Sequence, residues 1–156
     1  KTAYEIPKRD WSSDVCSSDL AVMATAMTGR QEPAVPRPVL PGEMKWADSP
    51  VAKGFRAAWV LGGEKAKGPY ILRVRVAKGS RLEPHSHPDE RQTTVLSGSI
   101  RVGFGDRFDE GRMVEIPAGA VLVVPAGTTH FVWARDGDAE YQETGVGPTG
   151  TVLAPR

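Results

Sequence analysis

The sequence contains a single cysteine, Cys16, and no excess of charge of either sign. One cysteine says little about redox compartment. The 20 Lys and Arg residues against 19 Asp and Glu residues give a formal net charge of +1, without a basic stripe interleaved with aromatics. This balance argues against a nucleic-acid partner. No apolar run approaches the about 20 residues that a membrane helix needs, so we expect no membrane span.

Several catalytic motifs are also missing from the sequence. It has no glycine-rich phosphate loop, no nucleophile elbow around a serine, and no cysteine placed for catalysis. No internal repeat or low-complexity tract is present. At 156 residues, the chain is long enough for one domain with a proper core and too short for two ordinary ones.

The first 54 residues do not read like part of the domain. The segment "DWSSDVCSSDL", residues 10–20, can be encoded by DNA that resembles a sequencing-library adapter, so residues 1–20 are interpreted as an artefact. A flexible Ser- and Asp-rich tail is the alternative. Residues 21–54 are interpreted as a leader or signal-peptide remnant followed by an N-terminal arm, because 21–28 is apolar and rich in small residues. This predicts a periplasmic or secreted protein, with a cytoplasmic location as the alternative.

Residues 55–156 break into short segments bounded by glycine and proline. Tyr70, Leu72 and Val74 alternate with Arg73 and Arg75, the pattern of a half-buried strand. Only 105–111 suggests a helical turn. This spacing predicts an all-β domain, either a sandwich, a jelly roll or a small barrel. The predicted strands are 57–62, 69–76, 93–98, 99–104, 112–117, 120–125, 129–135 and 139–146.

The three histidines of the chain are placed for a common metal site. His85 and His87 are two residues apart, so on a strand they point to the same side and can bind one ion together. His130 begins another predicted strand. Singly, each is more typical of a surface or hydrogen-bonded residue, but the set indicates metal binding.

The same residues resemble the two motifs of the cupin superfamily. The first motif, G-x5-H-x-H-x3-or-4-E-x6-G, and the second, G-x5-P-x-G-x2-H-x3-N, occur in order, with a gap of twenty residues between them. The matching positions are Gly79, His85, His87 and Gly98, then Gly119, Pro125, Gly127 and His130. The resemblance covers roughly residues 55–150. It implies a single jelly-roll β-barrel of the cupin fold, a small bacterial single-domain member, and a homodimer to which residues 31–55 could add a strand.

Two positions depart from these motifs. Ala134 replaces an asparagine that is not a metal ligand, so little follows from it. The glutamate of the first motif falls on Arg91 or Gln92. Arginine stays protonated and repels a divalent ion. We therefore rank coordination by the three histidines with open positions first. Coordination that adds Gln92, Glu83 or Glu90 comes second, and the absence of a bound metal third.

Arg91 has two opposed interpretations. Beside a metal it could hold an anionic or carboxylate substrate; on the surface it would pair with Asp89 or Glu90. Regular alternation places Glu83 on the strand face of the histidines, where it could supply a carboxylate or a partner for Arg91.

Three aromatic residues could wall the site. Tyr70, Phe131 and Trp133 are the candidates, although each could equally be core. Alternation places Phe131 opposite His130, which favours a core position for Phe131.

The function predicted first is that of a metal-dependent oxidoreductase of the dioxygenase type. It would act on a small organic molecule in the barrel mouth, with Arg91, Glu83 and Tyr70 as catalytic candidates. The metal would be a divalent transition ion: Fe, Mn, Cu, Ni or Zn. The alternatives are a non-catalytic metal- or small-molecule-binding sensor, and a metal-assisted isomerase or lyase. Fold alone does not choose among them.

Overall fold

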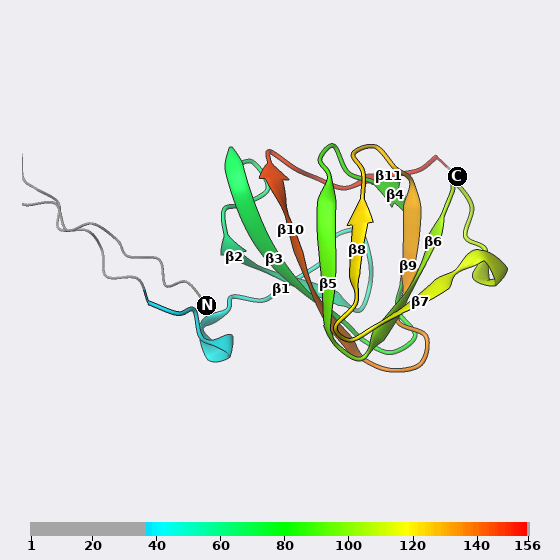
Figure 1. Cartoon of the computed structure of the whole chain (residues 1–156), viewed down its shortest axis with the longest axis horizontal. Coiled ribbons are helices and arrows are strands. Elements are labelled where there is room, and N and C mark those ends of the chain that lie inside the picture. Colours follow the sequence, from blue (N-terminus) through cyan, green and yellow to red (C-terminus); the bar gives the residue numbers. More distant parts are fainter. Residues whose placement is uncertain (1–36, 156) are drawn as a thin grey trace, which may run out of the picture. The chain divides into compact units, whose positions relative to one another are not determined.

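The computed structural model describes residues 37–155, which lie in a compact unit that begins at Arg37. This part of the chain consists almost entirely of strands (Figure 1). The predicted artefact at 1–20 and the predicted leader at 21–28 lie outside the described residues. No helix among the described residues is long and apolar enough to cross a membrane.

Eleven strands and two short 3₁₀ helices make up the unit. In chain order they are η1 (Pro41–Glu43), β1 (Ala47–Asp48), β2 (Phe55–Leu61), β3 (Gly68–Val76), β4 (Arg81–Ser86), β5 (Arg91–Ser97), β6 (Ser99–Phe104), η2 (Glu110–Arg112), β7 (Val114–Pro117), β8 (Val121–Val124), β9 (His130–Trp133), β10 (Ala139–Gly147) and β11 (Val152–Leu153).

The strands form two antiparallel sheets. Sheet A has the order β1-β2-β3-β10-β5-β8, and sheet B has the order β11-β4-β9-β6-β7. Sequence neighbours are often separated within a sheet, as when β10 lies between β3 and β5 (Figure 1). Two packed antiparallel sheets with such crossovers are the jelly-roll arrangement. The predicted all-β jelly-roll fold is therefore confirmed.

The core lies between the sheets and follows from alternation. In β3, Leu72 and Val74 are buried between the sheets. Arg73 and Arg75 point outward and both bond the Glu140 carboxylate of β10. The hydrophobic face of β3 thus fills the core, and its charged face forms ion pairs with β10 at the surface.

A tight turn at Ser97–Gly98 joins β5 to β6, which lie in different sheets and do not pair as a hairpin. Gly98 has φ 68°, a left-handed conformation that side chains disfavour, and a Cβ there would collide with the Asp138 carbonyl oxygen. Only glycine fits this close approach. This turn passes the chain from sheet A to sheet B.

The folded unit starts earlier than the predicted boundary at residue 55. β1 pairs with β2 of the same chain, with Ala47 opposite Ala57. Residues 47–48 thus extend sheet A of their own chain. A second short strand that the sequence did not indicate is β11, which pairs with β4 beside His85.

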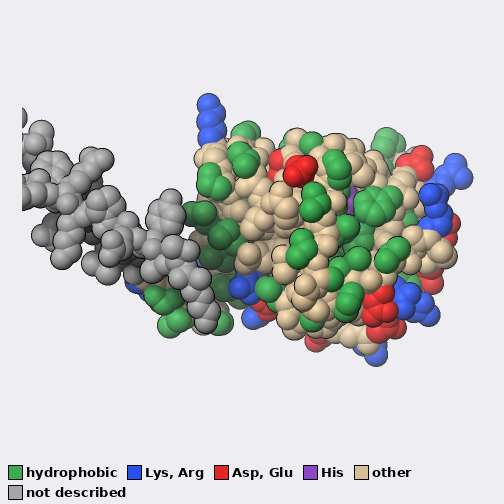
Figure 2. Space-filling model, viewed as in Figure 1, with side chains coloured by type: hydrophobic (Ala, Val, Ile, Leu, Met, Phe, Trp, Pro, Cys, Tyr) green, Lys and Arg blue, Asp and Glu red, His purple; other side chains and the backbone are tan. Residues whose placement is uncertain are grey.

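One face of the domain is rich in apolar and neutral side chains. Figure 2 shows them over the region of β5 and β8, where Leu96, Val121 and Val123 are exposed. Charged side chains gather towards the margins of this view.

Candidate metal centre

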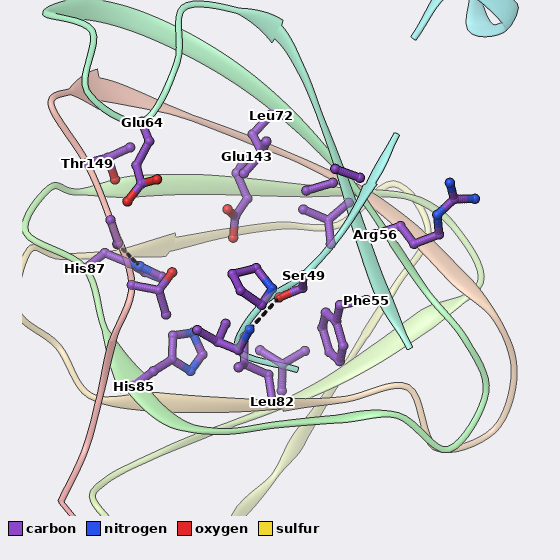
Figure 3. A pocket seen from close by; sticks show the side chains of 18 of the residues that line it. Ser49, Phe55, Arg56, Glu64, Leu72, Leu82, His85, His87, Glu143 and Thr149 are labelled. Atoms are coloured by element: carbon purple, nitrogen blue, oxygen red, sulfur yellow. Dashed lines mark hydrogen bonds between the residues drawn. The ribbon is translucent and has the colours of Figure 1, made fainter. Parts of the chain in front are cut away.

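A cavity of about 330 Å³ lies between the sheets. Sheet A contributes the apolar side chains of Leu72 and Val74 together with charged ones, and the three histidines come from sheet B and the loop after β4. Figure 3 shows His85, His87 and the Glu143 carboxylate directed into this space. Lys45 and residues 47–51, in and beside β1, also line the cavity.

The three histidines converge at one point of the cavity. His85 lies in β4, His87 follows that strand, and His130 opens β9, where it pairs directly with His85. One ring nitrogen from each of the three lies within 4.8 Å of the others, and all three side chains are buried. Among residues 37–155, this is the one group of histidines, cysteines and acids that could hold a metal ion. The two-residue spacing of His85 and His87 thus correctly predicted that both side chains point to one site.

Each imidazole is fixed by a hydrogen bond on its Nδ1 side. The acceptors are backbone carbonyls: Glu83 O for His85 at 2.8 Å, Gly150 O for His87 at 2.7 Å, and Thr128 O for His130 at 3.0 Å. A carbonyl can only accept, so Nδ1 carries the proton in all three rings. Each Nε2 is left with a free lone pair, the tautomer that binds metal.

The electrostatics of the cavity keep the histidines neutral. Burial, reinforced by the neighbouring His130, lowers the pKa of His85 to about 3. Burial and the Arg91 guanidinium lower the pKa of His87 to about 4, and burial also lowers the pKa of His130. Three neutral imidazoles need no deprotonation before they bind an ion. The donor set therefore fits a divalent transition metal that accepts nitrogen ligands.

Arg91 reaches into the same cavity from sheet A and is buried. Its Nη1 donates to Glu143 Oε2 at 2.6 Å. Its Nη2 donates to Thr149 Oγ1 at 2.8 Å and to Gly150 O at 3.2 Å. The predicted surface position of Arg91 is therefore wrong: its main partner is the buried carboxylate of Glu143, although Asp89 Oδ1 lies 3.8 Å from its Nε.

Further polar side chains extend this buried pair. Thr149 Oγ1 donates to one Asp89 oxygen, and Tyr70 Oη donates to the other at 2.6 Å. Burial raises the pKa of Tyr70, and the bond to Asp89 adds to this, so its hydroxyl remains protonated. Burial also raises the pKa of Glu143, while Arg91 opposes that shift. The network fixes the chain segment that carries Thr149 and Gly150.

The chain also matches a known family. A family model described as a cupin domain matches residues 72–142, a range that includes all three histidines. Residues 72–142 of this chain therefore form a cupin domain.

The curated relatives that match this cupin include plant proteins. Germin-like protein 3-1 of Oryza sativa subsp. japonica is 36% identical over 77 residues, or 49% of this chain and 34% of the relative. Germin-like protein 5-1 of the same plant is 36% identical over 83 residues, or 51% of this chain and 36% of the relative. The matched part is thus about a third of the length of each relative. The predicted bacterial origin remains a prediction.

Solved structures share the fold at low identity. The polyketide cyclase RemF from Streptomyces resistomycificus gives a TM-score of 0.65 at 18% identity, covering 78% of this chain and 87% of that one. KdgF from Halomonas sp. gives 0.56 at 21% identity, covering 69% and 91%. An oxalate decarboxylase from Bacillus subtilis gives 0.54 at 19% identity, covering 67% and 28%. These likenesses support the cupin fold.

Glu83 does not share the inward face of the histidines in this cupin, so that prediction is wrong. In the pairing of β4 with β9, Leu82 lies opposite Val132 and His85 opposite His130. Three steps along β4 thus match two along β9, which is a bulge. The extra residue breaks the alternation: Leu82 and His85 both face inward, and Glu83 is exposed. Glu83 contributes through its backbone carbonyl alone, as the acceptor for His85.

Gln92 and Glu90 are not placed as ligands either. β5 pairs with β8 in regular register from Arg91 to Thr94, so no bulge turns Gln92 inward. The Gln92 amide accepts a bond from Thr144 and donates to Glu90, which is exposed. Both predicted ligands therefore face away from the cavity, and Arg91 takes the inward position.

The aromatic walls predicted from the sequence lie elsewhere. Tyr70 is buried but does not line the cavity, because its hydroxyl is held by Asp89. Phe131 packs on the other face of β9, against Phe108, and Trp133 lies on that face beneath the Arg81 guanidinium. The core interpretation of Phe131 is supported by this packing.

Sequence reasoning missed Glu143, Thr149 and Gly150. The alternation of β10 could have revealed Glu143, since it shares a face with Ala139 and Tyr141 in the predicted strand 139–146. A glutamate on a buried face is unusual unless it is paired. No local pattern indicated Thr149 or Gly150, because their roles depend on contacts with Arg91 and His87, 58 and 63 residues away.

Proposed function

We propose that this cupin is a metal-dependent enzyme that acts on a small organic molecule in the cavity between its sheets. The observation that carries the proposal is the convergence of three neutral imidazoles, each with Nδ1 bonded to a carbonyl and Nε2 free. The cavity of about 330 Å³ beside them is of a size to hold a small ligand.

A bound divalent ion would polarise substrate oxygens or lower the pKa of a bound water, and a redox-active ion would add electron transfer. His85, His87 and His130 would hold it. Because the three ligands are neutral, they leave the charge of the ion uncompensated. We therefore propose a substrate with a carboxylate or another negatively polarised oxygen.

The remaining cavity residues would bind and orient this molecule. Leu72 and Val74 offer an apolar wall that excludes water from one side. Arg91 is not free to hold the substrate by itself, because Glu143, Thr149 and Gly150 already accept from its terminal nitrogens. We therefore assign Arg91 to a buried ion pair with Glu143, in place of the predicted role as a substrate clamp.

An oxygenase-type reaction is the first form of this proposal. Three histidine ligands leave several positions of a six-coordinate ion for substrate and O₂. The test loads the metal-free full chain with Fe²⁺ or Cu²⁺ and measures oxygen uptake with a panel of small carboxylates and phenols. Substrate-dependent uptake that is lost in a His130→Ala variant supports it. Turnover without oxygen uptake excludes the oxygenase form.

A metal-assisted isomerase or lyase is the second form, and Glu143 favours it. This carboxyl group faces the cavity, and burial raises its pKa against the opposing effect of Arg91, so it is a candidate for proton transfer. The deciding experiment is anaerobic turnover with Zn²⁺, a redox-inert ion. Product formed under those conditions in wild type and lost in Glu143→Gln supports the second form. Ligand-dependent thermal stabilisation with no turnover across both experiments would instead assign a binding module.

A further inference from the structure

Arg91 and the metal-binding histidine His87 share one acceptor. The Gly150 carbonyl accepts from His87 Nδ1 at 2.7 Å and from Arg91 Nη2 at 3.2 Å. The other two histidines bond carbonyls two residues before them in the chain, Glu83 and Thr128. His87 alone relies on a distant segment, 63 residues further along. Its orientation therefore depends on whatever holds Gly150 in place.

Arg91 helps to hold this segment, together with the Asp89 carboxylate and the Glu64 carbonyl, which accepts from Thr149 N at 2.8 Å. Besides Gly150, Arg91 bonds Thr149, whose hydroxyl also donates to Asp89. The guanidinium, 5% exposed, is rigid and planar, so its fork can engage several acceptors at once. Glu143 compensates the charge of Arg91 through a bond of 2.6 Å within the same buried space.

From these contacts we propose that Arg91 and Glu143 act together as a positioning unit for the metal site. Arg91 anchors Thr149 and Gly150, and through the Gly150 carbonyl it sets the tautomer and the ring orientation of His87. Glu143 makes the buried cation compatible with a metal ion nearby. Neither residue would bind the metal itself; together they would orient one of its ligands, His87. This inference rests on the metal centre proposed above.

The test compares Zn²⁺ affinity across full-length variants by competition with a chromophoric chelator. The main variant is Arg91→Met/Glu143→Gln, which removes the anchor without leaving a buried carboxylate unpaired. Its expected Zn²⁺ affinity is about 10-fold to 100-fold lower, the usual effect of losing a group that orients a ligand. Thr149→Val removes one acceptor of Arg91 and leaves the charges intact, so a smaller loss is expected.

A matched control is Arg73→Met. Arg73 also bridges from a sheet A strand to β10, through Gln142 and Glu140, but on the outer face of the sheet. Its Zn²⁺ affinity should equal that of the wild type. Thermal unfolding of every variant separates a change in stability from a change in the site.

A second readout distinguishes positioning from mere support of the fold. In ¹⁵N-labelled protein, the Nδ1–H signals of the three histidines report their bonds to the carbonyls. The main variant should lose the His87 signal to exchange with water and keep those of His85 and His130. A folded main variant with wild-type affinity and an unchanged His87 signal would overturn the inference. A wild-type protein that binds no Zn²⁺ would instead overturn the proposed metal centre.

Discussion

Three side chains, from β4, the loop after it and the adjacent strand β9, provide the imidazole nitrogens of the site. His85, His87 and His130 each have Nδ1 bonded to a backbone carbonyl, so the lone pair of Nε2 can bind a metal ion. The three rings also converge closely enough to share one ion, and this can be tested one residue at a time.

Replacing any one of these histidines with alanine should remove bound metal. Each supplies a third of the donor set, so we expect affinity to fall by more than about 100-fold, beyond the loss seen for groups outside the ligand set. Elemental analysis of the purified variants measures this directly. Glu83→Ala is the control, because its exposed side chain points away and metal content should stay at the wild-type level. Full metal retention in any two histidine variants would contradict the assignment.

The stability of the metal-free protein should fall as the pH is lowered from 7 to 5. In the unfolded chain these histidines take up protons near pH 6.5, whereas in the fold the pKa is about 3 for His85 and about 4 for His87. Between those values the unfolded state binds more protons, so acid favours unfolding. We expect a loss of about 2 kcal/mol for each of these two histidines at pH 5.

Urea unfolding at the two pH values measures this loss. The variant His87→Gln should show a smaller difference, since it lacks one of the two groups. An unfolding free energy that is equal at pH 7 and pH 5, in wild type and variant alike, would count against the buried neutral histidines.

At the scale of elements, β9 is the strand on which the site depends most. It pairs with β4 on one side and β6 on the other, and all four of its residues are buried. His130 faces the cavity, while Phe131 packs on the opposite face, where a Cβ on Gly103 of β6 would meet its ring. The absence of a side chain at Gly103 thus leaves room for the Phe131 ring to pack on β6.

Gly103→Ala should therefore destabilise the fold and disturb the site at once. The added methyl group must displace the Phe131 ring, and overpacking of this kind typically costs about 1–3 kcal/mol. Chemical unfolding measures the stability, and Zn²⁺ titration measures the effect on His130. Gly137→Ala is the matched control, since nothing lies within 4 Å of a Cβ at that position. Equal stability of the two variants would show that Phe131 yields freely.

The sequence correctly predicted side-chain directions where the spacing of residues along a strand decides them. The common direction of His85 and His87 and the alternation of β3 both follow from local geometry. Glu83 was misplaced because a bulge adds one residue to β4, and a bulge has no fixed sequence signature. The pair of Arg91 and Glu143 spans 52 residues, so its existence depends on which strands become neighbours.

At the scale of the whole domain, the two sheets line the cavity with different kinds of side chain. Sheet B and the loop after β4 supply the histidines, whereas sheet A supplies Arg91 and Glu143. The chain between β10 and β11 links them, since Gly150 contacts both sets. A metal bound here should therefore stabilise the domain as a unit. The homodimer and the export of the protein remain predictions from the sequence.

Added Zn²⁺ should raise the thermal unfolding temperature of the metal-free wild type. An ion that binds only the folded state adds about 2.7 kcal/mol at a free concentration of 100 times its Kd. Differential scanning calorimetry across a Zn²⁺ series should show a midpoint that rises with the logarithm of the concentration. His130→Ala should show no such rise, and the same rise in both proteins would place the ion elsewhere.

The family match ends at residue 142, one position before Glu143. The histidines lie inside the matched range, but the partner of Arg91 and the segment of Thr149 and Gly150 lie beyond it. A substitution at Glu143, Thr149 or Gly150 would therefore change how Arg91 and His87 are held and leave both histidine motifs unaltered. The chemistry of the cavity can thus be changed from a segment that contains none of the histidines.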